Sequence, residues 1–185
     1  MPSVLIPLAT GCEELEAVTV IDLLRRAAID VVSAGLSSAL EPVRASRGTV
    51  LLPDMTLDQA LRRDFDMIVL PGGLPGADHL NADRRIHTLL QQMHQHGKYI
   101  AAICAAPKVL ADAGLLSNRR ATSYPGSLNA AQLAGVDYQQ QAVVRDGHII
   151  TSRGPGTAMD FALTLVELLA GHERRLQVEQ GLVRG

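Results

Sequence analysis

The chain has 185 residues, of which 47% are hydrophobic and 19% charged, and its formal net charge is −2. This composition is typical of a compact globular protein with a sizeable core, and it excludes an intrinsically disordered chain. The near balance of charge, with no Trp and only three Tyr and two Phe residues, argues against a nucleic-acid-binding surface.

Short apolar runs alternate with amphipathic stretches of helical length. The runs predict β-strands at 4–6, 31–34, 49–51, 67–70 and 99–103. Several of these strands are apolar on both faces, as expected where helices cover both sides of a parallel sheet. Amphipathic periodicity predicts helices over 13–27, 83–96 and 105–112. The alternation indicates an α/β fold with a mostly parallel sheet covered by helices on both faces.

The pattern changes beyond residue 120. Residues 142–151 predict a late β-hairpin that turns at Asp146 and Gly147. A final helix follows residues 154–156, because apolar residues then recur at helical spacing, at Met159, Leu163, Val166 and Leu169. Residues 37–47 read as a loop. We expect a single domain over 1–185.

The location and redox environment follow from what the sequence does not contain. No apolar run approaches the length of a bilayer-spanning helix, and the N-terminus lacks the pattern of a signal peptide. The two cysteines, Cys12 and Cys104, do not form a disulfide framework, and no Cys and His spacing resembles a zinc site. We therefore expect a cytosolic protein with no metal and no membrane association.

Cys104 is the strongest candidate for a catalytic group. It follows the predicted strand 99–103 and precedes a predicted helix, and ligands bind beyond the carboxyl ends of strands in such sheets. A cysteine at a sharp turn between a strand and a helix projects its sulfur into that crevice, and the free N–H groups of the helix stabilise a thiolate. The alternative is a buried structural cysteine.

The end of a second strand points to the same crevice. Gly72 and Gly73 follow the strand 67–70, and their N–H groups are candidates for an oxyanion hole together with the N–H of Ala105. The alternative is a plain turn between a strand and a helix.

Three glutamates follow the first strand. Glu16 and Glu13 each share a helix face with apolar residues, so periodicity alone does not choose between them as an inward-facing carboxyl. A buried carboxyl would be protonated and could donate a hydrogen bond to a thiolate. For at least two of the three glutamates, Glu13, Glu14 and Glu16, the favoured interpretation is a solvated first helical turn that complements the helix dipole.

Five segments together resemble the ThiJ/PfpI superfamily, in the branch of the parkinsonism-associated protein deglycase. They are residues 13–18, 46–48, 69–73, 101–107 and 151–157, and the similarity extends over essentially the whole chain. The resemblance implies a flavodoxin-like sandwich, a homodimer and an oxidisable cysteine in a strained elbow. It also implies that Glu16 is the partner of Cys104, and that Arg26 and Arg47 line the site near the subunit boundary. It implies no cofactor.

One position departs from the family pattern. The stretch that carries a histidine near the cysteine in the parkinsonism-associated protein reads Thr122-Ser123-Tyr124-Pro125 here. Tyr124 could bind a substrate or close the pocket, but tyrosine is a poor proton shuttle near neutral pH. The protease members place His directly after the cysteine, where this chain has Ala105, so a peptidase is disfavoured.

These residues predict a cysteine-dependent, stress-protective enzyme of the deglycase or glyoxalase type. Cys104 would attack a small aldehyde or a glycated substrate, Gly73 and Ala105 would stabilise the oxyanion, and Glu16 would donate and accept the proton. The alternative is a redox sensor or an oxidation-responsive chaperone in which Cys104 is oxidised to sulfinic acid.

Overall fold

A seven-stranded sheet forms the centre of the structure, a computed structural model that describes residues 1–184. Its strands, in spatial order, are β10 (Val143–Asp146), β11 (Ile149–Ser152), β7 (Tyr99–Ile103), β6 (Met67–Leu70), β1 (Ser3–Leu8), β2 (Asp30–Gly35) and β5 (Met55–Thr56). All neighbouring strands are parallel except β10, which pairs with β11 as an antiparallel hairpin. The carboxyl ends of β1, β6 and β7 therefore lie at one edge of the sheet.

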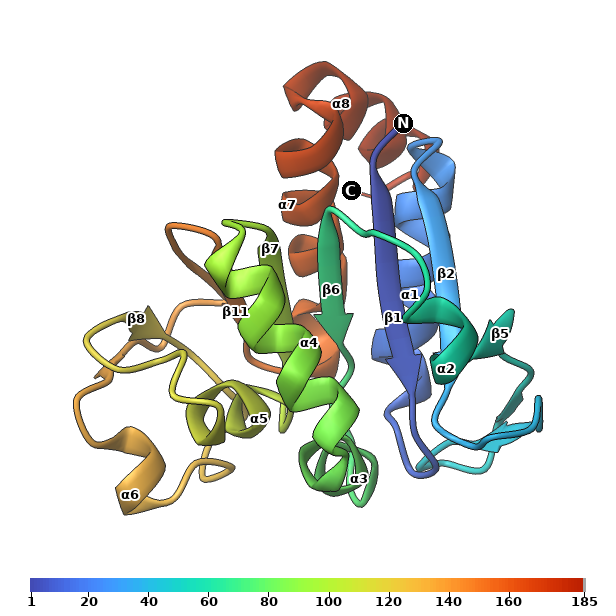
Figure 1. The fold of residues 1–185 in the computed structure, drawn as a ribbon. Helices are drawn as coiled ribbons and strands as arrows, with labels where there is room; N and C mark the ends of the chain where they lie inside the picture. Colours follow the sequence, from blue (N-terminus) through green and yellow to red (C-terminus); the bar gives the residue numbers. More distant parts are fainter. Residues whose placement is uncertain (185) are drawn as a thin grey trace.

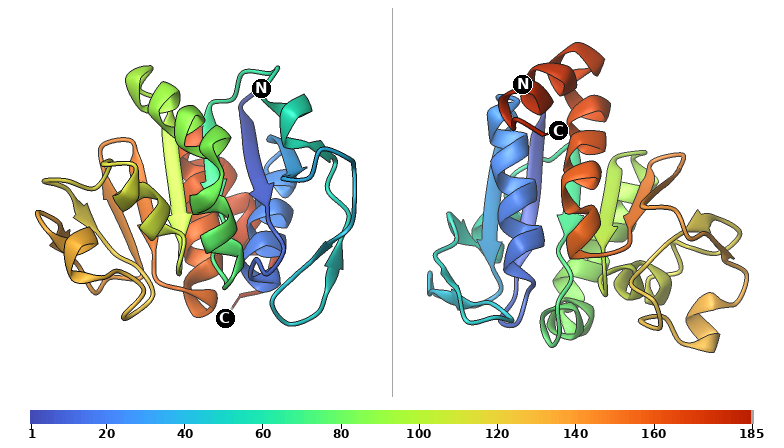
Figure 2. Two further views of the ribbon diagram at one scale, coloured as in Figure 1. Left: turned by 60° about the horizontal axis from the view of Figure 1, so that its bottom comes forward. Right: turned by 180° about the vertical axis from the view of Figure 1, so that it is seen from behind.

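Helices cover both faces of this sheet (Figures 1 and 2). On one face lie α1 (Glu14–Arg26), α7 (Ala158–Ala170) and α8 (His172–Gly181). On the other lie α2 (Leu57–Ala60), α4 (Arg84–Gln95) and α5 (Pro107–Asp112), while α3 (Gly76–Ala82) lies at the carboxyl edge. This arrangement confirms the predicted flavodoxin-like α/β sandwich and its late hairpin.

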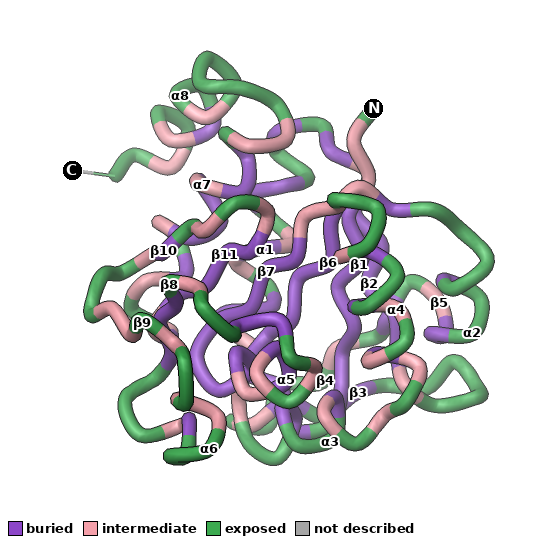
Figure 3. The backbone as a smooth tube through the Cα atoms, turned by 60° about the vertical axis from the view of Figure 1, so that its left-hand side comes forward, coloured by how far each residue is buried: buried purple, intermediate pink, exposed green. Residues whose placement is uncertain are grey.

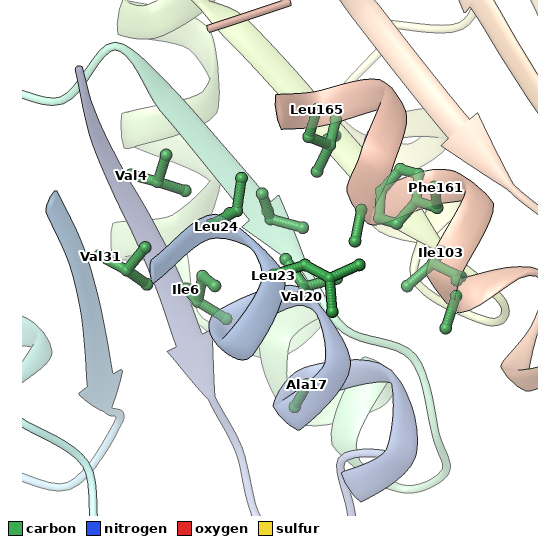
Figure 4. Close-up of a cluster of buried hydrophobic side chains, with 14 of the residues drawn as sticks. Val4, Ile6, Ala17, Val20, Leu23, Leu24, Val31, Ile103, Phe161 and Leu165 are labelled. Carbon is green, nitrogen blue, oxygen red and sulfur yellow. The ribbon is translucent and has the colours of Figure 1, made fainter. Parts of the chain in front are cut away.

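The core consists of two apolar layers, one on each face of the sheet, and the central strands between them are buried along most of their length (Figure 3). In one layer, Val20, Leu23 and Leu24 of α1 pack toward β1 and α7 (Figure 4). Phe161 is the largest side chain buried there. The core is therefore almost entirely aliphatic, and its fit fixes α1 and α7 against the strands that carry the site.

The longer helices follow the predicted periodicity closely. Glu13 caps α1, and Asp83 caps α4, each by accepting a hydrogen bond from a backbone N–H two residues ahead. In place of the helix predicted over 105–112, α5 begins at Pro107, because proline suits the first turn, where its missing N–H is not needed.

The strand predicted at 49–51 is wrong as a member of the main sheet. Only Val50 and Leu51 are extended, as β4 (Val50–Leu51), and they pair with β3 (Val43–Arg44) in a separate two-stranded ribbon. Val50 is 52% exposed, whereas Leu51 is partly buried against the core, so the short apolar run lies beside the main sheet and not within it. The edge strand of the sheet is β5 instead, which follows Pro53.

Residues 113–141 form an outlying region with little regular structure. It contains β8 (Arg120–Ala121), α6 (Ala130–Leu133) and β9 (Asp137–Tyr138), and β8 pairs with β9. Figure 1 places this region beside the hairpin, beyond the end of α5. None of the helices within residues 1–184 combines the length and apolar character needed to cross a bilayer.

Candidate active site

Cys104 occupies the sharp turn that the sequence predicts. It follows the last residue of β7, and its φ of 64° lies in the left-handed region, which is strained for a residue with a side chain. Backbone hydrogen bonds hold it on both sides: its N–H donates to the Ser152 carbonyl at 3.0 Å, and its carbonyl accepts from the Tyr124 N–H at 2.8 Å. The expected elbow is therefore confirmed in its backbone geometry.

Glycine at position 72 allows the site to close. A Cβ added there would lie 2.5 Å from the Cys104 Cβ and 2.8 Å from Glu16 Oε2. Gly73 has a φ of 86°, and a Cβ on it would meet the backbone of residues 11–13. Both glycines therefore let the loop after β6 lie directly between the cysteine and the start of α1.

Glu16 lies beneath the cysteine, fully buried. Its Oε2 accepts a hydrogen bond from the Gly72 N–H at 2.9 Å, whereas Oε1 makes no well-formed hydrogen bond with any group in residues 1–184. Burial raises the pKa of this carboxyl from 4.5 to about 7, against the opposing effects of the Gly72 N–H and the Cys104 thiol. A carboxyl in this environment exchanges its proton near neutral pH.

The thiol of Cys104 does not have the lowered pKa that the helix N-terminus led us to expect. Burial raises the pKa of Cys104 to about 12, and the charge of an ionised Glu16 and its hydrogen bond with the thiol add to this effect. The N–H groups of Gly73 and Ala105 act in the opposite direction and lower the pKa. The two contributions from Glu16 require its carboxylate form. A protonated Glu16 instead donates a hydrogen bond that stabilises the thiolate, so the pair shares one proton.

The other two glutamates have separate positions. Glu13 is 8% exposed, and its carboxylate accepts hydrogen bonds from the Leu15 N–H at 3.2 Å and the Ser46 hydroxyl at 2.9 Å. Glu14 is half-buried, and its carboxylate binds the turn 46–49. The structure therefore places only Glu16 directly against Cys104, in agreement with the resemblance.

A cavity of about 550 Å³ opens above the thiol. It is lined by Glu13, Ser46, Arg47, Gly73, Leu74, Cys104, Ala105, Tyr124, Pro125, Gly126, Ser127 and Pro155. Two hollows elsewhere on the surface, of about 510 and 440 Å³, contain neither cysteine. This cavity is the candidate substrate-binding site because Cys104 lies in its wall.

Two of the three predicted pocket residues line this cavity. Tyr124 is 52% exposed, with its ring against Gly154, and Arg47 is an exposed residue of the same lining. Arg26 is wrong as a pocket residue within one chain. It is the last residue of α1, ten positions from Glu16, and its side chain is paired with Asp22 at 2.6 Å. A helix rises about 1.5 Å per residue, so Arg26 lies at the far end.

Several lining residues were not singled out from the sequence as parts of the pocket. Ser46 had a usable signal, because it stands beside Arg47 in a segment that carries the family resemblance. Pro155 lies in another such segment, 151–157, whereas Gly126 and Ser127 had no signal, since only the tertiary fold brings their loop to the carboxyl edge. No group of three or more His, Cys, Asp and Glu side chains within 1–184 is arranged to hold a metal ion.

Comparison with known proteins agrees with this geometry. Residues 2–168 match the DJ-1/PfpI family. The chain is 45% identical over 182 residues to Protein dj-1beta of Drosophila melanogaster, covering 98% of this chain and 96% of that protein. The crystal structure of Drosophila melanogaster DJ-1beta matches with a TM-score of 0.94 and 44% identity, covering 100% and 98% of the two chains.

A relative with a named activity is also similar. The chain is 38% identical over 162 residues to the glutathione-independent glyoxalase DJR-1.2 of Caenorhabditis elegans, covering 88% of this chain and 85% of that protein. The match in sequence and fold confirms the resemblance seen in the five motifs: the chain belongs to the DJ-1/PfpI family.

Proposed function

We propose that this protein is a glyoxalase-type enzyme that converts 2-oxoaldehydes to 2-hydroxy acids without glutathione, using Cys104 as the nucleophile. The observation that carries the proposal is the contact between a thiol and a buried carboxyl whose pKa is raised to about 7, beneath a cavity of about 550 Å³. The activity named for the relative from Caenorhabditis elegans supports it.

The first step forms a carbon–sulfur bond. With the shared proton on Glu16, the Cys104 thiolate attacks the aldehyde carbon, and the carbonyl electron pair moves to oxygen. The N–H groups of Gly73 and Ala105, which hydrogen-bond to the sulfur and lower its pKa, stabilise that oxyanion. Glu16 then gives its proton to the oxygen, which yields a hemithioacetal and a carboxylate.

The second step moves a hydrogen between the two carbons of the substrate. The Glu16 carboxylate removes the proton from C1, which leaves an enediolate, and Glu16 then returns the proton to C2. The proton of the C1 hydroxyl moves to the C2 oxygen, so that C1 becomes the thioester carbonyl and C2 carries the hydroxyl. The product is a thioester in which C1 has been oxidised and C2 reduced, so no external oxidant is needed. Water hydrolyses the thioester, releasing the 2-hydroxy acid and the Cys104 thiol.

The deglycase reaction begins with the same attack. A glycated amine carries the carbonyl compound as a carbinolamine, whose carbon–nitrogen bond breaks to release the free amine and the aldehyde. The thiolate then attacks this aldehyde, and the later steps are unchanged. The cavity is open and far larger than a three-carbon aldehyde, so it has room for part of a modified side chain.

The alternative prediction, a redox sensor or oxidation-responsive chaperone, has weaker support. Oxidation to sulfinic acid begins from a thiolate that peroxide can reach. Cys104 is only 8% exposed, and its pKa is raised while Glu16 is ionised. A protein of this kind would oxidise faster as Glu16 becomes protonated.

The product and its isotope content test the proposed reaction. Methylglyoxal incubated with the protein in D₂O, without glutathione, should give lactate that carries deuterium at C2, because the proton on Glu16 exchanges with solvent during the transfer. NMR of the product measures this. Lactate with protium at C2 would contradict proton transfer by Glu16, and no lactate would contradict the function.

We also propose that the chain forms a homodimer through α1 and β4. Leu15 and Val18 of α1 are 50% and 45% exposed, and Leu52 after β4 is 66% exposed. Val18 and Leu52 line one common hollow, and Leu15 precedes Val18 by three residues on the same helix, so these exposed apolar side chains lie close together, as they do at interfaces. Arg26 ends the same helix, and its predicted place in the pocket depends on this dimer.

Charge placed in this patch should disrupt the dimer. Sedimentation of the wild type at micromolar concentration should give a dimer, and Val18→Asp with Leu52→Asp should give a monomer, because both carboxylates would be buried in the interface. Leu176→Asp on α8 is the matched control and should remain dimeric. A monomeric wild type would reject the proposal.

We also propose a single domain and a cytosolic location. A single domain is supported by the sheet, which contains β1 near one end of the chain and β11 near the other. The cytosolic location stays a prediction.

A further inference from the structure

The start of α1 carries a carboxylate to which the proposed reaction gives no role. Glu16 contacts Cys104 and Glu13 lines the cavity, but Glu14 points to the turn 45–49 instead. This turn connects β3 with β4 and lies beyond the carboxyl end of β1, beside the beginning of α1.

Three donors of the turn converge on the Glu14 carboxylate. The Arg47 N–H lies 3.0 Å from each of its oxygens, the Thr49 N–H lies 3.3 Å from Oε1, and the Ser46 hydroxyl lies 3.1 Å from Oε2. Burial raises the pKa of this carboxyl, but the N–H groups of Glu14, Arg47 and Thr49 and the Ser46 hydroxyl outweigh it and lower the pKa to about 2. Glu14 is therefore a permanent anion at physiological pH.

The same turn forms one wall of the active-site cavity. Ser46 and Arg47 both line it, and the Ser46 hydroxyl is also 2.9 Å from Glu13 Oε2. A hydroxyl has one proton, so Ser46 donates to Glu13 or Glu14 at any moment and links the two carboxylates. Arg47 bonds Glu14 through its backbone, which leaves its guanidinium for the cavity.

We propose that Glu14 is a positioning residue that sets the charge preference of the active site. By holding the backbone of the turn 45–49, its carboxylate keeps Arg47 in the wall of the cavity that contains Cys104, where the guanidinium favours carbonyl substrates that carry a carboxylate or phosphate group. Glu14 itself touches no substrate. The part of this inference that concerns substrates rests on the proposed function.

Glutamine cannot replace Glu14 in this role. The turn offers three donors to two carboxylate oxygens, and an amide has a single acceptor oxygen, so its NH₂ group would face a backbone N–H. Glu14→Gln should therefore release the turn and let Arg47 leave the cavity wall. The substitution removes a negative charge near the thiol, so a purely electrostatic effect would act in the opposite direction and favour anions.

Alkylation of Cys104 separates these two effects without any turnover. Iodoacetate and iodoacetamide have nearly the same size but differ in charge, and the ratio of their rates at one pH cancels the fraction of thiolate. Peptide mapping assigns the label to Cys104. The ratio of iodoacetate to iodoacetamide should fall about two- to fivefold in Arg47→Ala, the range for one partly exposed charge, and by a similar factor in Glu14→Gln.

The double variant and a distant control complete the test. Glu14→Gln with Arg47→Ala should show no further fall, because both substitutions remove the same guanidinium from the site. Glu173→Gln on α8 removes a charge elsewhere and should leave the ratio unchanged. A ratio that rises or stays constant in Glu14→Gln, or that is unaffected by Arg47→Ala, would overturn the proposal.

Turnover distinguishes this proposal from the function on which it partly rests. In Glu14→Gln, the KM for the anionic substrate 3-phosphooxy-2-oxopropanal should rise by a larger factor than the KM for methylglyoxal. Equal factors would overturn the assigned substrate preference. If neither aldehyde is converted by the wild type, the proposed function fails, and the alkylation ratio alone decides the positioning role of Glu14.

Discussion

Glu16→Gln is expected to stabilise the protein at pH 8 by about 3 kcal/mol while it lowers turnover of methylglyoxal by about 10²–10⁴-fold. The gain in stability is expected because a fully buried carboxyl must ionise at this pH in the wild type. Gln has the same shape, and its amide oxygen can accept the hydrogen bond that the Gly72 N–H donates to Glu16. The loss of turnover is expected because an amide cannot accept and return a proton.

The direction of the expected change in the free energy of unfolding follows from the raised pKa of Glu16. Burial raises the pKa of Glu16 from 4.5 to about 7 in the folded protein. Between these values the folded state holds a proton that the unfolded state has released, so the free energy of unfolding of the wild type falls as the pH rises. Each pKa unit corresponds to about 1.4 kcal/mol, and the loss is complete above the folded-state pKa.

Urea denaturation from pH 4 to pH 8 measures this effect. The free energies of unfolding of the two proteins should agree below pH about 4.5 and separate as the pH rises, with Glu16→Gln the more stable. Glu173→Gln on the exposed surface of α8 is the control and should follow the wild type. A difference that does not shrink toward pH 4 would show that the carboxyl is not protonated by burial.

Much of the fold could be predicted from local sequence because its longest elements keep a regular period. β6 and β7 are apolar on both faces, and α1 has an amphipathic pattern. Each of these local patterns predicts which residues are buried without information about distant residues. The elbow at Cys104 was visible for the same reason, since a buried strand ends there and a helix with proline in its first turn begins shortly after.

The choice between Glu13 and Glu16 could not be made from periodicity. Both side chains are buried, but Glu13 precedes the helix as its cap and faces the cavity, whereas Glu16 lies within the helix below Gly72. A helical period describes only residues that are helical, so the cap residue does not follow it. The resemblance to the family implies that Glu16 is the partner of Cys104, which the helical period alone does not.

Other errors come from contacts between distant segments. The apolar pair Val50 and Leu51 predicts a core strand, yet Val50 is exposed and Leu51 is only partly buried, in a hollow that also contains the exposed Val18 of α1. Apolar residues in an interface between chains have the same local pattern as those in a core, so the proposed dimer explains the error. The role of Glu14 was likewise hidden, because its partners lie more than 30 positions away.

The central claim is that Cys104 is the nucleophile. Replacing each cysteine in turn distinguishes a catalytic thiol from a structural one. Cys104 lines the cavity against Glu16, whereas Cys12 is completely buried outside the cavity lining, where burial raises its pKa to about 12. Cys104→Ser keeps the shape of the elbow but replaces the thiol with a hydroxyl that ionises far less readily and that Glu16 does not activate.

Turnover of methylglyoxal to lactate without glutathione, measured for the wild type, Cys104→Ser and Cys12→Ala, tests that claim most directly. We expect Cys104→Ser to lose roughly 10²-fold or more in kcat/KM. Cys12→Ala should keep a value close to that of the wild type, even if removal of a buried side chain lowers its melting temperature. Equal turnover by wild type and Cys104→Ser, or a loss confined to Cys12→Ala, would contradict Cys104 as the nucleophile.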